Sequence, residues 1–263
     1  MAVYLDNNAT TALDERVLEA MLPYMGQVTG NPSSVHRFGR LQRDAIEQAR
    51  ESVARLVGAR AEQVVFTSGG TESNNLLING FYQQGGDGRI AVSAIEHMSL
   101  LEPAQNLGAM LDIIQADENG HINRFALEQV LEEKTSLVSV MTANNETGVI
   151  QDLSPLVDFA AENNCFFHTD ATQAAGKIAL DFAGSGMHAM TISAHKLYGP
   201  VGAGALIIDK RLPIKKLQFG GSQEKNLRAG TENVPAIVGF GRAAELAIAE
   251  MQENAQHVHV LRD

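Results

Sequence analysis

Apolar and polar residues follow two alternating patterns along the chain. Short, almost continuously apolar runs rich in Val, Ile, Leu and Phe alternate with segments that have a helical period. The short runs predict buried strands, because strands covered on both faces lose the polar alternation of half-exposed ones. These runs lie at residues 62–70, 89–97, 110–117, 136–148, 165–173, 190–196 and 204–209.

The segments with a helical period predict helices before, between and after these strands. In the clearest case, apolar residues recur every four positions from Leu41 to Val57, and the pattern ends near Gly58. The predicted helices cover residues 41–57, 71–84, 124–134, 154–164 and a long segment from about Val234 onward. This alternation predicts an α/β fold: a three-layer sandwich with a mostly parallel central sheet.

Composition and charge narrow the classes of function. The 263 residues suffice for one large α/β domain or two small ones, and the net charge of −11 argues against binding to nucleic acid. A lone cysteine, Cys165, cannot form an internal disulfide and suits a reducing compartment. The sequence has no signal-peptide pattern and no apolar run long enough to span a membrane, so we predict a cytoplasmic protein that is not bound to a membrane.

Polar residues follow five of the predicted strands. In an open α/β sheet, ligands bind beyond the carboxyl ends of the strands, so we expect these residues to form one site at one edge. They are residues 67–71, Glu96 and His97, residues 144–146, residues 169–173, and His195 and Lys196.

The first of these groups has the outline of a phosphate cup. Gly69 and Gly70 allow the backbone to approach a ligand closely, Ser68 and Thr71 add hydroxyl groups, and the following helix directs free N–H groups and its dipole at an anion. The Walker pattern is missing, and taken alone the segment is better explained as a plain strand–helix turn.

The other candidates are also ambiguous one by one. Asp170 could be a helix cap or an ion-paired core residue, His97 a structural histidine, and Lys196 a surface charge. Together they fit pyridoxal 5'-phosphate (PLP), which needs a lysine for its Schiff base, an acid opposite its ring nitrogen and a phosphate cradle. A nicotinamide site would need a G-x-G-x-x-G turn after the first strand, and no such turn follows it. His97 and His195 lie too far apart in sequence to suggest a zinc site.

A set of longer motifs resembles a known family. The motifs occur in family order from about Tyr4 to Val234, and they are YLDNNATT, GNPSSVHRFGR, FTSGGTESNN, EH, NNETGVIQ, HTDATQAAGK, SAHKLYGP and LRAGTENV. With them the chain resembles the cysteine desulfurases, which are fold-type-I PLP enzymes of the class V aminotransferase group. The resemblance implies the large PLP-binding domain of that fold.

The resemblance also implies a role for each motif residue. Lys196 would carry the Schiff base, Asp170 would pair with the ring nitrogen, and His97 would stack on the ring and transfer protons. The other implied cofactor contacts are Gln173 with the phenolic oxygen, Asn145 near that oxygen and the substrate, and Gly70, Thr71, Ser193 and His195 with the phosphate. Thr231 would reach the phosphate of a neighbouring subunit, which implies a homodimer.

The implied reaction converts L-cysteine to L-alanine and leaves sulfur as a persulfide on a cysteine thiolate. That sulfur would pass to an acceptor or scaffold protein for iron–sulfur cluster assembly. In relatives, a C-terminal third supplies the acceptor cysteine and a substrate-binding arginine, and this third is absent here. We therefore expect residues 1–12 to form an N-terminal arm, 13–250 the large domain and 251–263 the start of a connection to a missing small domain.

Two further features depart from the family. Cys165 precedes an apolar strand and is better explained as a structural thiol than as the sulfur acceptor. Lys225 and Asn226 replace a common Arg-Gly pair, and because Asn tolerates a left-handed backbone, we expect the turn to survive.

Other functions stay open at this stage. The same scaffold serves selenocysteine lyases, C–S lyases and class V aminotransferases, and a shortened chain could be a PLP-binding dimer without activity. Alanine, pyruvate and sulfide released from L-cysteine would distinguish these alternatives.

Overall fold

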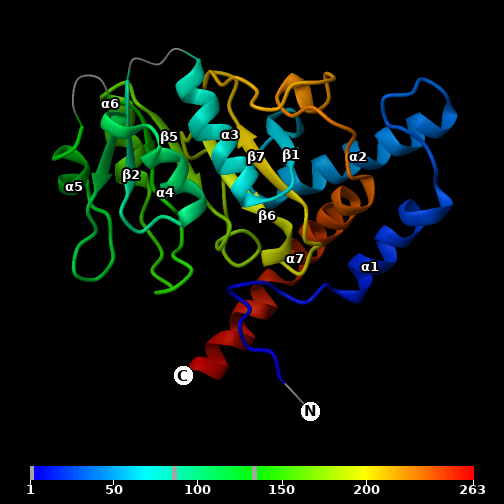
Figure 1. Cartoon of the computed structure of the whole chain (residues 1–263). Coiled ribbons are helices and arrows are strands. Elements are labelled where there is room, and N and C mark those ends of the chain that lie inside the picture. The colour runs from blue at the N-terminus through cyan, green and yellow to red at the C-terminus, as the bar shows by residue number, and fades with distance from the viewer. Residues whose placement is uncertain (1–2, 85–87, 132–134) are drawn as a thin grey trace.

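A seven-stranded sheet forms the centre of the molecule, as the computed structural model in Figure 1 shows for residues 3–84, 88–131 and 135–263. The strand order is β1-β7-β6-β5-β4-β2-β3. The strands are β1 (Val64–Thr67), β2 (Arg89–Ser93), β3 (Leu111–Ile114), β4 (Thr135–Ser139), β5 (Phe166–Asp170), β6 (Ala189–Ser193) and β7 (Gly204–Ile208). β7 pairs antiparallel with β1 and β6, and the other pairs are parallel. The predicted mostly parallel sheet is therefore confirmed.

The helices agree with the sequence prediction in most places. They are α1 (Glu15–Leu22), α2 (Arg37–Leu56), α3 (Gly70–Gln83), α4 (Met98–Gln105), α5 (Arg124–Glu128), α6 (Ser154–Glu162) and α7 (Val234–Arg262), with a π-helical turn at Pro23–Gln27 and 3-10 turns at Ala61–Gln63, Gly108–Met110, Ala194–Lys196 and Glu224–Asn226. The helix expected at 124–134 is shorter, since α5 ends at Glu128, and residues 132–134 lie outside the described part of the chain. The sequence pattern did not predict α1 or α4.

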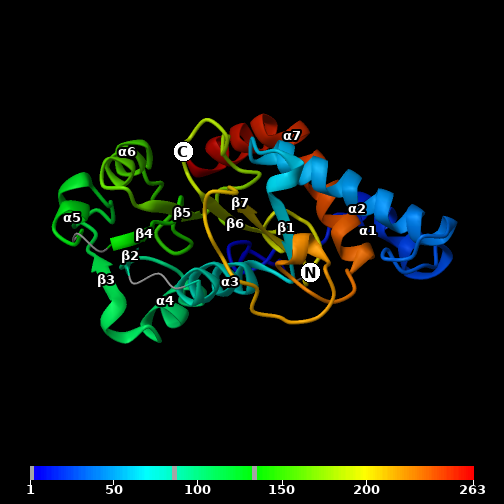
Figure 2. The same ribbon diagram turned by 90° about the horizontal axis from the view of Figure 1, so that it is seen from above.

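Helices cover both faces of the sheet, as Figure 2 shows from above. α3 and α4 lie on one face, and α2, α5, α6 and α7 lie on the other. Within β1, Val65 packs in the core beneath α3, whereas Val64 and Phe66 pack in the core beneath α2 and α7. Burial on both faces explains why the strands are continuously apolar in sequence.

The longest helices, α2 and α7, pack closely on each other. A Cβ atom at Gly241 of α7 would lie 2.6 Å from the Cα atom of Ala49 on α2, so only glycine fits at this contact. The final turns of α7, after Met251, are exposed. Within the described residues, no helix is both long and apolar enough to cross a membrane.

Candidate active site

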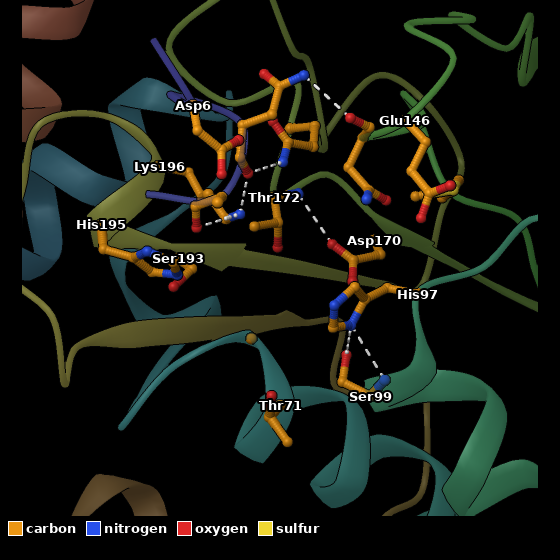
Figure 3. A pocket seen from close by; sticks show the side chains of 16 residues that line it. Asp6, Thr71, His97, Ser99, Glu146, Asp170, Thr172, Ser193, His195 and Lys196 are labelled. Carbon is orange, nitrogen blue, oxygen red and sulfur yellow. Dashed lines mark hydrogen bonds between the residues drawn. The ribbon is translucent and has the colours of Figure 1, made fainter. Parts of the chain in front are cut away.

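A cavity of about 590 Å³ opens at the carboxyl edge of the sheet (Figure 3). Its walls come from the N-terminal segment, the start of α3 and the segments that follow β2, β4, β5 and β6. The lining residues are Asp6, Asn8, Ala9, Gly70, Thr71, His97, Ser99, Met141, Asn145, Glu146, Asp170, Thr172, Gln173, Ser193, His195 and Lys196.

This cavity gathers every residue to which the family resemblance gives a role at the cofactor, except Thr231, whereas Ser68 of the expected phosphate cup does not line it. Gly70, Thr71, His97, Asn145, Asp170, Gln173, Ser193, His195 and Lys196 all line it. Thr231 is exposed and lines a separate surface hollow with Tyr24 and Gln42 among others. Within one chain, Thr231 is therefore not part of the site.

The end of the cavity next to α3 is a polar cradle. α3 begins at Gly70, so its unpaired N–H groups and the positive end of its dipole lie at this wall. The Oγ atom of Ser193 and the Oγ1 atom of Thr172 are buried there without a hydrogen-bond partner among the described residues. Unpaired buried hydroxyl groups are costly in a folded protein, and they indicate a place prepared for a polar ligand group.

Close backbone contact holds this loop in position. A Cβ atom at Gly204 of β7 would lie 2.5 Å from the Cα atom of Gly69, so the loop passes directly over a glycine in the neighbouring strand. A Cβ atom at Gly70 would lie 3.3 Å from Thr172 Oγ1 and would narrow the cradle. The glycines therefore set the size of this end of the cavity.

Asp170 ends β5 and is only 5% exposed. Its Oδ1 atom accepts a hydrogen bond from the backbone N–H of Thr172 at 2.9 Å, and its Oδ2 atom accepts one from Asn74 Nδ2 at 2.8 Å. Both donors are neutral, and no ion pair involving Asp170 occurs among the described residues. The carboxylate is thus oriented while its charge stays uncompensated at close range.

His97 caps the N-terminus of α4 beside Asp170. Its Nδ1 atom accepts the backbone N–H of Ser99 at 3.1 Å and lies 2.8 Å from Ser99 Oγ. Because a backbone N–H can only donate, the neutral ring carries its proton on Nε2.

Lys196 ends the 3-10 turn that follows β6. Its Nζ atom donates to the carbonyl oxygens of Asn8 and Ala9, with a distance of 2.9 Å to the oxygen of Ala9. Burial lowers the pKa of Lys196, while the negative charges of Asp170 and Asp6 oppose this change. The amine is therefore biased towards the neutral, nucleophilic form compared with a solvated lysine.

His195 precedes this lysine and lines the same wall. Its Nδ1 atom lies 3.1 Å from Thr10 Oγ1. Burial lowers the pKa of His195, and the nearby charge of Lys196 lowers it further. The ring is thus biased towards its neutral form, which can donate one hydrogen bond.

The N-terminal segment closes the cavity opposite the sheet. The carbonyl oxygen of Asn8 accepts from Gln173 Nε2 at 2.9 Å as well as from Lys196, and Asn8 Nδ2 donates to the Asn145 carbonyl at 3.0 Å. Sequence reasoning gave no role to Asp6, Asn8 or Ala9. The only signal was that they belong to the motif YLDNNATT, because nothing in the local pattern shows that this segment reaches residues nearly two hundred positions away.

Glu96 and Asn144, which also follow predicted strands, do not line the cavity. Glu96 is buried, and its Oε1 atom accepts from Ser93 Oγ and from the backbone N–H of Met141, both at 2.6 Å. Burial raises the pKa of Glu96 to about 8, and the charge of Asp170 adds to this effect. Asn144 donates to the carbonyl of Ile95 at 3.0 Å, so both residues support the strand ends.

Cys165, the residue that the sequence suggested as a structural thiol, lies away from the cavity. Cys165 is buried and its Sγ atom donates to the carbonyl of Thr135 at 3.1 Å, while burial raises the pKa of its thiol. This agrees with the expected structural thiol. In the part of the chain that is described, no group of three or more His, Cys, Asp or Glu side chains could hold a metal ion.

Comparison with known proteins agrees with this geometry. The class-V aminotransferase family matches residues 3–263. Among curated relatives, the cysteine desulfurase IscS of Dictyoglomus turgidum is 46% identical over 266 residues, covering 99% of this chain and 68% of its own length. The cysteine desulfurase IscS of Methanosarcina thermophila is 42% identical over 267 residues, covering 100% of this chain and 66% of its own length. The chain therefore spans about two thirds of the length of these relatives.

Solved structures give the same result. A structure described as a NifS-like protein superimposes with a TM-score of 0.96 and 39% identity, covering 100% of this chain and 74% of the other. A structure described as SspA in complex with cysteine superimposes with a TM-score of 0.88 and 36% identity, covering 93% and 72%. From these matches and its fold, the chain belongs to the class-V aminotransferase family and is a homologue of its cysteine desulfurases.

Proposed function

We propose that this chain is the PLP-binding part of a cysteine desulfurase that acts on L-cysteine. One observation carries the proposal above the others: the Lys196 amine, the Asp170 carboxylate and a cradle of unpaired hydroxyl groups all face one cavity. The names of the relatives and the cysteine complex of one structural neighbour support the substrate.

The residues present fit PLP. The cradle formed by Gly70, Thr71, Ser193 and His195 would hold the phosphate, and the unpaired Ser193 hydroxyl would gain a partner there. Asp170 would accept a hydrogen bond from the ring nitrogen, and Gln173 and Asn145 would contact the ring oxygen. When bound, PLP supplies an aldehyde that condenses with amines and a ring that draws electrons from the substrate.

The side chains of the chain itself would divide the remaining work. Lys196 offers a nucleophilic amine and, once released, a base that can take and return a proton. Asp170 would present its carboxyl group to the ring nitrogen, held in position by the neutral donors of Asn74 and Thr172. His97 presents its Nε2 atom as the second position from which a proton can be given or taken.

Sulfur transfer needs a thiolate, and Cys165 is badly placed to supply it. Cys165 precedes β5 and Asp170 ends it, so five steps along the extended chain, roughly 16 Å, separate them. The thiol is also buried and its pKa is raised. We therefore propose that the acceptor thiol is supplied from outside these 263 residues.

A homodimer completes the proposal. Thr231 is exposed and lies apart from the cavity of its own chain, as a residue that serves the neighbouring subunit must. Sedimentation of the PLP-loaded protein should show a dimer. Thr231→Val should weaken PLP binding while the protein stays a dimer, because Thr231 would contact the phosphate of the neighbouring subunit.

Reconstitution with PLP tests the main proposal. The purified chain should gain a visible absorbance band that is absent in Lys196→Ala, and with L-cysteine and a small thiol as sulfur acceptor it should release alanine. Pyruvate as the main product would favour a C–S lyase, and PLP binding without any product would favour an inactive PLP-binding dimer. A chain that binds no PLP would contradict the proposal.

A further inference from the structure

Asn74 connects two walls of the cavity without lining it. It lies on α3, one turn after Gly70, and its relative exposure is 0%. A polar side chain in such a position must satisfy its hydrogen bonds within the protein.

Both hydrogens of the Asn74 amide are used. The Nδ2 atom donates to Asp170 Oδ2 at 2.8 Å and to Ser99 Oγ at 3.0 Å. One amide group therefore holds the end of β5 and the first turn of α4 at the same time.

The amide has only one favourable orientation. Its Oδ1 atom is buried and has no hydrogen-bond partner within the described part of the chain. Turning the amide over would place that oxygen against the Asp170 carboxylate and would remove both donors, which costs more than one unpaired carbonyl. The charge of Asp170 therefore fixes the amide.

This orientation sets the direction of the next hydrogen bond. Ser99 Oγ accepts from Asn74, so its single proton is free to go to His97 Nδ1, 2.8 Å away. Figure 3 shows Ser99 joined to His97 below Asp170. Each hydrogen bond from Asp170 through Asn74 and Ser99 to His97 thus has a fixed donor and acceptor.

We propose that Asn74 is a positioning residue that couples Asp170 to His97 through Ser99. A change in the hydrogen bonding of Asp170 reorients the Asn74 amide, alters the donor to Ser99 and is felt at His97 Nδ1. The meaning for catalysis rests on the proposed function, since Asp170 and His97 are the groups placed at the edge and face of the cofactor ring. The coupling itself is a property of the chain without cofactor.

The experiment measures this coupling by ¹⁵N NMR of histidine-labelled, cofactor-free protein at a fixed alkaline pH. The His97 signals are assigned by their loss in His97→Gln. The displacement of the Nδ1 signal caused by Asp170→Asn is then compared in four backgrounds: wild type, Asn74→Leu, Ser99→Ala and Asn75→Ala. Any direct electrostatic effect of Asp170 on His97 is present in every background and cancels in the comparison.

We expect the displacement in the wild type to fall by at least half in Asn74→Leu and in Ser99→Ala. It should persist in Asn75→Ala, because Asn75 bonds to the Thr71 carbonyl and to Asn79 on another side of α3. Ser99 is only half-buried, so its variant keeps the test valid if Asn74→Leu does not fold. An equal displacement in all backgrounds, or none in the wild type, would overturn the proposal.

A second measurement connects the coupling to the cofactor. Asn74→Leu should weaken PLP binding about tenfold, because Asp170 loses one of its two hydrogen-bond donors, and Ser99→Ala should weaken it less. Unchanged PLP affinity in Asn74→Leu would contradict the positioning role. If the wild type binds no PLP, the proposed function fails, while the NMR comparison still decides the coupling.

Discussion

Two buried carboxylates in this molecule have opposite surroundings. The Glu224 carboxylate accepts hydrogen bonds from both terminal nitrogens of Arg50 and from the backbone N–H of Phe66, each at 2.7 Å. Asp170 is equally buried, but its hydrogen-bond donors among the residues described are both neutral, and it faces a cavity.

The difference separates a structural charge from a functional one. The Glu224 charge is fully compensated, so this pair joins α2 to the turn at Glu224–Asn226 and to β1. The Asp170 charge is held in place but left available, which suits an incoming positive group. A buried carboxylate therefore indicates a binding site only when its partners orient it without neutralising it.

The largest effect is expected from breaking the Glu224 pair. Arg50→Met leaves Glu224 buried without its counter-ion, and we expect the free energy of unfolding to fall by about 3–5 kcal/mol. Arg242→Met, which breaks an exposed pair with Glu245, should change it by less than ~1 kcal/mol. Urea denaturation measures the free energy of unfolding of both variants. Equal losses would show that the buried ion pair stabilises the protein no more than an exposed one.

Glu96 tests a third situation, a buried carboxyl that forms no ion pair with any described residue. Its pKa is raised from 4.5 to about 8, so between these values the folded state holds a proton that the unfolded state has lost. Stability should therefore fall as the pH rises from about 5 to 8, by about 3 kcal/mol, and Glu96→Gln should lose this dependence. Subtracting the two unfolding curves removes the contribution of other groups, including His168, whose pKa burial lowers to about 3. Parallel curves would contradict the protonated state.

Asp170→Asn should affect activity more than stability, the opposite of what we expect for Arg50→Met. Because neutral donors already surround this carboxylate, we expect the free energy of unfolding to change by less than ~1 kcal/mol. Alanine formation from L-cysteine, however, should fall about a hundredfold or more, since the positive ring nitrogen loses its counter-charge. A variant with a much lower free energy of unfolding but unchanged alanine formation would contradict the functional role assigned to Asp170.

The sequence could predict the sheet and most of the cavity for one physical reason. Parallel strands buried on both faces are continuously apolar, and their carboxyl ends meet at one edge, so the polar residues after them become neighbours. Lys196, Asp170 and His97 could thus be brought together before any coordinates were known.

The remaining features depend on contacts that local sequence does not encode. α1 and α4 have only eight residues each, about two turns, which is too short for a periodic pattern to stand out in the sequence, and α4 also contains Pro103. Asn74 resembles any polar residue in a helix until Asp170 is placed beside it. The role proposed for Thr231 needs a second chain, which no pattern within one chain can position.

The smallest effect is expected at the turn that carries Glu224. Glu224, Lys225 and Asn226 all have left-handed backbones, with φ of 42°, 58° and 63°, so the turn predicted from Asn226 is present. Asn226→Val should lower the free energy of unfolding by about 1–2 kcal/mol, because a β-branched side chain is disfavoured there, whereas Asn226→Gly should stay within ~0.5 kcal/mol. Thermal unfolding of both variants measures the difference. Since the turn positions Glu224 but is far along the chain from Asp170, PLP binding should be equal in the two variants; a loss of PLP binding in Asn226→Val would mean that the structural and functional carboxylates are coupled after all.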